Sequence, residues 1–164
     1  MNVTASSSNH AGSADAPFHD GRMLIGGRMV ESVGGQWLES RNPANLQLIG
    51  RGPAANAEDA ALAVEAALKA QKDWAKLDMD QRAALLLKFC DKLKERSDEI
   101  LAIEVADTGN TIMPMRKDIA NGLERLKYFI GLAYELKGQS VPSTAKNLHF
   151  TVREPYGVCA RILA

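Results

Sequence analysis

Few residues of this sequence combine a type and a spacing that would suit catalysis. The two cysteines, Cys90 and Cys159, have no histidine near them in the sequence, although a nucleophilic thiol needs a neighbouring base or cation. Cys90 falls on an apolar helical stripe and is expected to pack as a small hydrophobic side chain. Glu104 and Asp107 lie three residues apart, a spacing that usually marks a solvated helix face rather than a catalytic pair. The sequence therefore predicts no catalytic residue.

Cofactor and metal motifs are missing as well. The sequence contains neither a GxGxxG turn nor a P-loop, so no cofactor-binding residue is predicted. No group of histidines and cysteines has the spacing of a zinc site. His149 follows an alternating apolar pattern, where a packed or solvated ring is expected rather than a ligand.

The charge balance excludes some partners. The 164 residues carry 20 basic and 20 acidic side chains, so no electrostatic footprint for nucleic acid or for an anionic membrane surface is present. No apolar run reaches the ~20 residues of a membrane span. Two widely separated cysteines argue against a disulfide framework. These features predict a cytoplasmic protein with a small-molecule partner.

The first part of the chain is expected to form a tail and then short strands. Residues 1–22 are poor in large apolar side chains and predict a disordered tail, with the folded part running over 23–164. The glycine pair after Ile25 suits a tight hairpin turn. Trp37 and Leu38 begin a further strand that ends at Asn42 and Pro43. A short strand before Pro53 completes the region, and strands of this length need other elements to pack on.

Four helices should follow. Capping patterns at Asn56 and Asp78 predict the first two helix starts, and Ser97 is the expected cap of the third. Gly109 is placed to end the third helix in a left-handed conformation. The longest helix should begin near Pro114 and end at Gly138. Its expected inward face holds Met115, Ile119, Leu123, Leu126, Ile130, Ala133 and Leu136, and that of the first helix holds Ala57, Ala60, Val64, Ala67, Leu68 and Trp74.

Beyond the helices the apolar period changes to two. Leu148, Phe150 and Val152 alternate with polar residues and predict a half-buried strand. A second strand is expected over 158–164. The sequence stops within that apolar run, which is the expected appearance of an incomplete domain.

Several short motifs follow one another in a recognisable order. They are the glycine-turn hairpin, Asn42-Pro43-Ala44, the Ala-rich helix ending in Trp74, the helix start at Gln81-Arg82, Glu104 followed by Asp107-Thr108-Gly109, and Arg153-Glu154-Pro155-Tyr156-Gly157-Val158. This order resembles the N-terminal third of the NAD(P)-dependent aldehyde dehydrogenase superfamily, over about 23–164. The specificity lies in the order and spacing of the motifs rather than in any one of them.

The resemblance implies an α/β fold: short hairpin strands, a four-helix block, and a β-ribbon strand that leads into an incomplete dinucleotide-binding sheet. It implies an enzyme that oxidises aldehydes with NAD or NADP through a cysteine thiohemiacetal and thioester, and a homo-oligomer when full length. In the family, the strand after the Arg-Glu-Pro motif runs on to the asparagine that holds the oxyanion. That asparagine, the catalytic cysteine and the catalytic glutamate have no match in this sequence, so the chain alone is expected to be inactive and to bind no cofactor.

The resemblance also implies a monovalent cation site. Some members hold such a cation between an aspartate that matches Asp107 and backbone carbonyls that match Ser40 and Arg41. This sequence has Asn110 where lysine often follows the glycine, and the alternative interpretation, that Asp107 caps and solvates a helix end, is favoured over the cation site.

Two other interpretations remain open. A free-standing helical module without catalysis could bind full-length subunits, and it would be stable by itself. A non-oxidising relative, such as an acyl-phosphate reductase, shares the architecture but typically lacks the motifs at 107–109 and 153–158 in this order. Neither the aldehyde nor the choice between NAD and NADP can be inferred from these residues.

Overall fold

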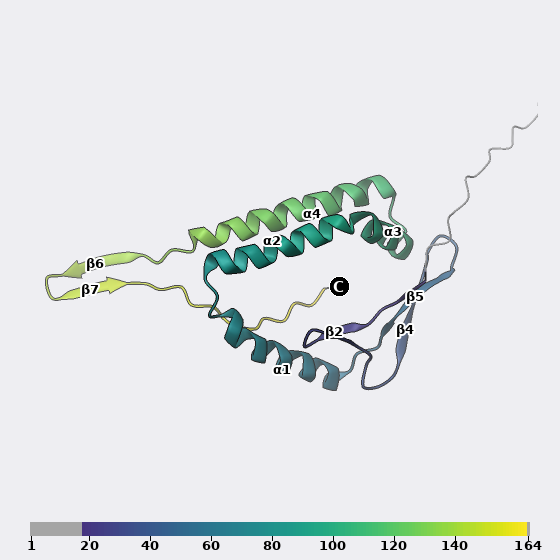
Figure 1. Cartoon of the computed structure of the whole chain (residues 1–164), viewed down its shortest axis with the longest axis horizontal. Helices are drawn as coiled ribbons and strands as arrows, with labels where there is room; N and C mark the ends of the chain where they lie inside the picture. The colour runs from purple at the N-terminus through teal and green to yellow at the C-terminus, as the bar shows by residue number, and fades with distance from the viewer. Residues whose placement is uncertain (1–17, 164) are drawn as a thin grey trace, which may run out of the picture.

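The structure is a computed structural model that describes residues 18–163. The chain folds as four helices with small sheets at both ends (Figure 1). Three helices, α2, α3 and α4, lie together, and α1 lies apart from them beside the N-terminal strands. The predicted order of short strands, a four-helix block and a ribbon is confirmed.

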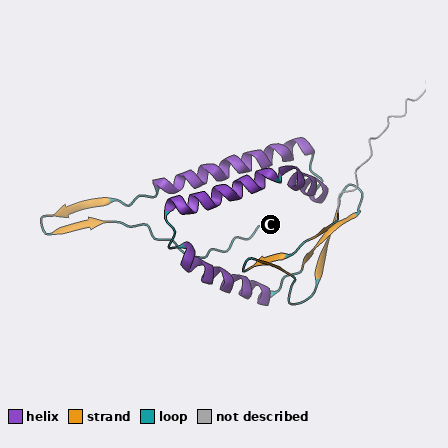
Figure 2. Cartoon of the chain, in the orientation of Figure 1, coloured by secondary structure: helices purple, strands orange, loops and turns teal. Residues whose placement is uncertain are grey.

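The N-terminal strands form two small sheets, and most of them can be followed in Figure 2. The hairpin of β2 (Met23–Ile25) and β3 (Arg28–Val30) turns at Gly26 and Gly27, which have φ angles of 58° and 77°. Both central residues of a type I′ turn need such positive φ values, and β2 pairs with β3 in antiparallel, so the predicted hairpin is confirmed. The second sheet has the order β1-β5-β4, with β4 at Trp37–Arg41 and β5 at Leu48–Pro53.

The strand β1 (His19–Asp20) lies where the sequence predicted a disordered tail. It pairs with β5 in parallel, His19 opposite Gly50 and Asp20 opposite Arg51. A pairing between segments so far apart leaves no local signal, since it depends on the partner strand rather than on the composition of the tail. The tail prediction for residues 1–17 lies outside the described part of the chain.

The first two helices begin as predicted. In α1 (Ala57–Trp74) the side chain of Asn56 accepts hydrogen bonds from the backbone of Glu58 and Asp59, and in α2 (Met79–Glu95) Asp78 and Gln81 form a reciprocal capping box. Val64 and Leu68, expected on the inner face of α1, are exposed. The reason is that α1 packs mainly on the β2 hairpin and not on the other helices.

The boundaries of the last two helices differ from prediction in two places. The helix α3 spans Ser97–Thr108, and the Ser97 hydroxyl donates to the Leu93 carbonyl instead of capping the helix. Only one residue separates α2 from α3, so Ser97 follows the preceding helix too closely to act as a cap. The helix α4 (Ile112–Leu132) ends before Gly138, in the short 3₁₀ turn η1 (Ala133–Glu135).

The core lies between α2 and α4. Cys90 is completely buried there against Ala83 and Ile130, with Leu86 and Leu126 packed beside them. Cys90 is therefore a core side chain, as predicted. Among the described residues, no helix is long and apolar enough to cross a membrane.

The C-terminal part is a ribbon followed by an extended segment. The strands β6 (Ser140–Thr144) and β7 (Asn147–Phe150) form an antiparallel hairpin that projects away from the helices (Figure 1). Both strands are exposed along their whole length, whereas half-burial was predicted. Residues 151–163 form no strand, so the predicted strand at 158–164 is not present in its described part. A strand needs a partner for its backbone groups, and the described chain offers none at this place.

A buried carboxylate ties α1 to the loop after β3. Asp59, only 2% exposed, accepts hydrogen bonds from the Ser32 hydroxyl at 2.6 Å, the Val33 amide at 3.0 Å and the Asn56 amide at 2.9 Å. The Ser32 hydrogen bond, followed by those of the two amides, holds the pKa of the Asp59 carboxyl below its ordinary value. The helix start at Asn56 was predicted, but the hydrogen bond between Asp59 and Ser32, 27 residues away, was not.

Acid is expected to loosen this junction. Because the pKa of Asp59 is lowered on folding, its ionised carboxylate contributes stability that is complete above the ordinary pKa of about 4 and is lost as the pH falls through the lower folded value. The Val33 amide should therefore lose its protection against hydrogen exchange below about pH 4, after correction for the intrinsic rate. The Asp59→Asn variant should lose that protection already at neutral pH. Glu58→Gln, which changes an exposed carboxylate in the same turn, is the control, and equal protection in both variants would contradict the assignment.

Candidate functional site

The end of α3 packs against the turn that follows β4. Gly109 ends the helix with φ at 72°, and its amide donates to the Val105 carbonyl at 3.1 Å. A Cβ atom on Gly109 would lie 2.7 Å from Cγ of Pro43, so the proline ring approaches the Gly109 backbone as closely as a glycine permits. This contact fixes the position of Asp107 relative to β4.

Ser40 and Arg41 were the predicted partners of Asp107, and the side chain of Ser40 contacts the Asp107 carboxylate. The Ser40 hydroxyl donates a hydrogen bond to Oδ1 of Asp107. The guanidinium group of Arg41 points elsewhere, because it donates to the Glu39 carboxylate at 2.7 Å and to the Leu46 carbonyl at 3.3 Å. The register between β4 and β5 shifts between Ser40 and Arg41, and such a shift interrupts the regular ladder of backbone hydrogen bonds. The structure thus brings the Asp107 carboxylate to this irregular point of β4.

A cavity of about 280 Å³ lies beside this contact. Its polar lining residues are His19, Ser40, Arg51 and Asp107, and Arg41 is not among the residues that line it. Its other walls come from β1, from β5 and from an apolar face of α3. The lining residues are His19, Gly21, Ser40, Ile49, Gly50, Arg51, Gly52, Ala102, Ile103, Ala106 and Asp107. We call this space the Asp107 cavity.

The oxygen-bearing side chains of the Asp107 cavity are one carboxylate and one hydroxyl. Such hard oxygen ligands suit alkali and alkaline-earth ions. Within residues 18–163, no group of three or more His, Cys, Asp or Glu side chains could hold a metal ion.

The other residues with catalytic chemistry are not brought together. Cys90 is buried in the helical core, and Cys159 is an exposed free thiol whose only hydrogen-bond contact in the described chain is the Gly157 carbonyl, at 4.0 Å. His149 is exposed on β7, where its backbone amide donates to the Ser143 hydroxyl. Glu104 is exposed on α3. Within residues 18–163, neither thiol has a base among its hydrogen-bond partners.

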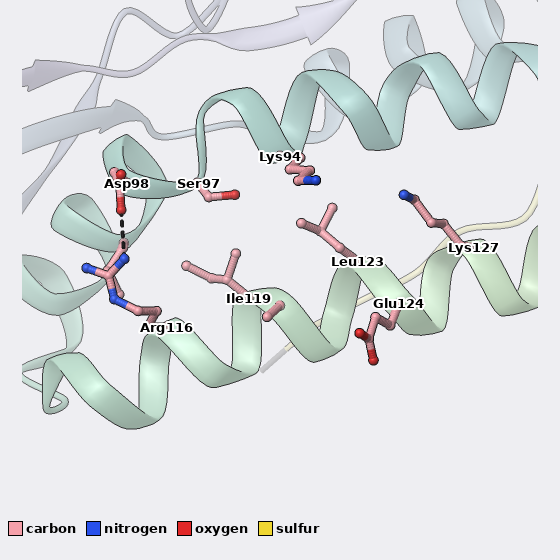
Figure 3. A pocket seen from close by; sticks show the side chains of 10 residues that line it. Lys94, Ser97, Asp98, Arg116, Ile119, Leu123, Glu124 and Lys127 are labelled. Atoms are coloured by element: carbon pink, nitrogen blue, oxygen red, sulfur yellow. Dashed lines mark hydrogen bonds and ion pairs between the residues drawn. The ribbon is translucent and has the colours of Figure 1, made fainter.

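A larger groove of about 440 Å³ lies between α4 and the ends of α2 and α3 (Figure 3). Its floor is apolar, with Ile119 and Leu123 from α4 pointing into it. An ion pair of 2.9 Å between Arg116 and Asp98 closes one end. The lining of this groove contains no pair of groups suited to proton transfer or nucleophilic attack. The groove is therefore separate from the Asp107 cavity in both position and chemistry.

Comparisons with known proteins give a consistent result. A model of the aldehyde dehydrogenase family matches residues 29–164. PnpE from Pseudomonas sp. WBC-3 is 34% identical with a TM-score of 0.78, over 84% of this chain and 28% of that chain. PnpE in complex with nicotinamide adenine dinucleotide is likewise 34% identical with a TM-score of 0.78, over 82% of this chain and 28% of that one. A putative aldehyde dehydrogenase from Burkholderia cenocepacia is 30% identical with a TM-score of 0.78, over 82% of this chain and 28% of that one. The chain thus spans less than a third of the length of these structures.

Proposed function

Because the chain belongs to the aldehyde dehydrogenase family, we propose that it is the N-terminal portion of an enzyme that oxidises aldehydes to carboxylic acids with NAD or NADP. The observation that carries the proposal is the match of 136 consecutive residues, 29–164, to the family model. The likeness to a relative that is solved with nicotinamide adenine dinucleotide supports the cofactor class. The activity belongs to the whole enzyme. This portion supplies the N-terminal helices and strands of its fold.

The nucleophile is proposed to come from the remainder of the enzyme. A thiolate that attacks an aldehyde must be exposed to substrate and activated by a base or a cationic neighbour. Cys90 is fully buried and fails the first condition, while Cys159 has no such neighbour among its hydrogen bonds. The chain alone should therefore neither oxidise an aldehyde nor retain a dinucleotide, and the bound cofactor would accept the hydride in the complete enzyme only.

The Asp107 cavity is proposed to hold a monovalent cation. The supporting observations are the exposed carboxylate, the neighbouring Ser40 hydroxyl and the register shift beside Arg41. Asp107 would supply the charged oxygen, and the backbone carbonyls of Ser40 and Arg41 would supply neutral ones. A cation at this point would attach the end of α3 to β4, a structural role without a chemical step.

Assembly and compartment are proposed from two further observations. The β6–β7 ribbon stands away from the helices with exposed faces (Figure 1), and exposed strand edges pair readily with another chain. We therefore expect the complete enzyme to be a homo-oligomer. Cys90 and Cys159 are both free thiols, as is usual in a reducing compartment, and we expect the enzyme to act in the cytoplasm.

Two single substitutions, Cys159→Ser and Cys90→Ser, test whether the nucleophile comes from the remainder of the enzyme. The complete enzyme should form NADH or NADPH from an aldehyde, and the Cys159→Ser variant should keep its rate within about threefold, because a spectator thiol contributes nothing to the transition state. Cys90→Ser is the partner variant, which should affect thermal stability more than rate. The measurement is the initial rate of reduced cofactor formation with a panel of aldehydes. A Cys159→Ser enzyme that is folded but inactive would refute the assignment, and a complete enzyme inactive with every aldehyde would refute the proposed reaction.

A further inference from the structure

The groove of about 440 Å³ between α4 and the ends of α2 and α3 has an apolar floor, and we call it the α4 groove. Leu101 of α3 is 5% exposed at its base, and Ile119 and Leu123 of α4 are half-buried and point into it (Figure 3). Small-molecule sites are commonly clefts of roughly 300–1,000 Å³ with a mainly apolar lining and a few polar groups. The α4 groove has both the size and the lining of such a site.

Two ammonium groups face each other above this floor. Lys94 from α2 and Lys127 from α4 both line the groove, and Figure 3 shows their side chains extending toward each other. Within residues 18–163, neither lysine takes part in an ion pair. The Glu124 side chain points away from both. Like charges that face each other repel, so an anion between the two lysines would be favoured there.

The opposite end of the α4 groove is closed. Arg116 and Asp98 form an ion pair of 2.9 Å across it, so the charge of that arginine is already matched. The rise of an α-helix between Ile119 and Lys127 is about 12 Å. The groove therefore offers an apolar track of limited length, with unmatched positive charge at one end only. A peptide that runs through the groove would meet the closed end, whereas a small molecule with a terminal head group would not.

We propose that the α4 groove binds an amphipathic carboxylate, a small molecule with an unbranched aliphatic chain and one terminal carboxylate. The carboxylate would accept hydrogen bonds from the ammonium groups of Lys94 and Lys127, and such charge-assisted hydrogen bonds are stronger than neutral ones. The aliphatic chain would lie on Ile119 and Leu123 and remove apolar surface from water. Binding involves no chemical step and does not depend on the aldehyde oxidation proposed above.

The chain offers a matched pair of double variants. Lys94→Gln with Lys127→Gln removes the two charges that face each other over the groove. Lys88→Gln with Lys117→Gln removes one charge from α2 and one from α4, at exposed positions outside the groove lining. Both variants change the net charge equally and on the same two helices. A difference between them therefore reports the position of the lysines and not the loss of charge.

Hydrogen exchange in the complete enzyme tests the site. Sodium decanoate is titrated below its micelle concentration at constant ionic strength, and exchange is followed by mass spectrometry. Decanoate should slow exchange in residues 97–101 and 119–127 of the parent enzyme and of the control variant. In the Lys94→Gln, Lys127→Gln variant, the decanoate concentration for half of this effect should rise at least about tenfold, because both donors to the carboxylate are lost.

Two further probes separate the head group from the chain. Hexanoate has the same head group and a shorter chain, and each buried methylene contributes a factor of about four in affinity. It should therefore bind at least about tenfold more weakly than decanoate. Decylammonium has a decyl chain and the opposite charge, so it should give no protection in residues 97–101 and 119–127.

The result that overturns the proposal is equally specific. Equal decanoate protection of these segments in the two double variants would refute the role of Lys94 and Lys127, and with it the proposed site. Protection by decylammonium equal to that by decanoate would show binding by the apolar floor alone and would also refute it. Decanoate protection confined to other parts of the enzyme would place the ligand elsewhere. None of these measurements uses enzyme turnover, so failure of the proposed reaction would leave them unaffected.

Discussion

The isolated chain is expected to bind a hydrophobic dye such as anilinonaphthalene sulfonate strongly and to unfold over a broad temperature range. In the described part of the chain, large apolar side chains of α4, the ribbon and the C-terminal segment are exposed. Examples are Ile112, Met113, Tyr128, Phe129, Leu148, Phe150, Val152, Ile162 and Leu163.

The size of the effect follows from the energy of burial. Each large apolar side chain left in water forgoes about 1.5–3 kcal/mol, so six or seven of them equal the ~5–15 kcal/mol by which a whole domain is stable. Dye fluorescence, light scattering after size exclusion and a circular dichroism melt measure the outcome. Leu148→Ser, on the exposed ribbon, should reduce dye binding and association without changing the helical signal. A soluble monomer with a sharp two-state melt would contradict the prediction and would favour a free-standing module.

Removal of the Ile130 side chain is expected to open the small helical core. Ile130 is 6% exposed and packs with Ala83 and Cys90, and Ile→Ala at such a site costs about 2–5 kcal/mol. Amide exchange in α2 around Cys90 should accelerate at least thirtyfold, roughly the factor that corresponds to 2 kcal/mol. Exchange is the right measurement because it needs no two-state transition of the whole chain.

The same substitution at the other end of α4 is the control. Ile112 is 54% exposed, so Ile112→Ala removes the same atoms without leaving a cavity, and α2 should exchange within about threefold of the parent. Equal acceleration by the two variants would show that α4 does not pack on α2 through Ile130.

Local signals made part of this structure predictable. The capping patterns at Asn56 and Asp78, the hairpin at Gly26 and the helix end at Gly109 each depend on residues within a few positions. Their geometry is decided by short-range sterics and hydrogen bonds, so the sequence alone was sufficient.

Features that depend on distant partners were missed. The β1–β5 pairing and the Ser32–Asp59 hydrogen bond join segments about 30 residues apart, and nothing in the sequence selects those partners. The strand predicted at 158–164 has the apolar composition of a buried strand but no neighbour in the described chain. For the site, the family resemblance pointed to Asp107, Ser40 and Arg41, but not to the part of the cavity wall that His19 and Gly21 form.

The approach of Gly109 to Pro43 restricts the order in which this protein can accept mutations. A side chain at position 109 would have to adopt a positive φ angle and would also clash with the proline ring. Replacing Pro43 first removes the clash but leaves the positive φ angle. Asparagine is the residue other than glycine that best tolerates a positive φ angle. Divergence at position 109 should therefore pass through a smaller residue at 43 and then asparagine, and the reverse order should give a less stable intermediate.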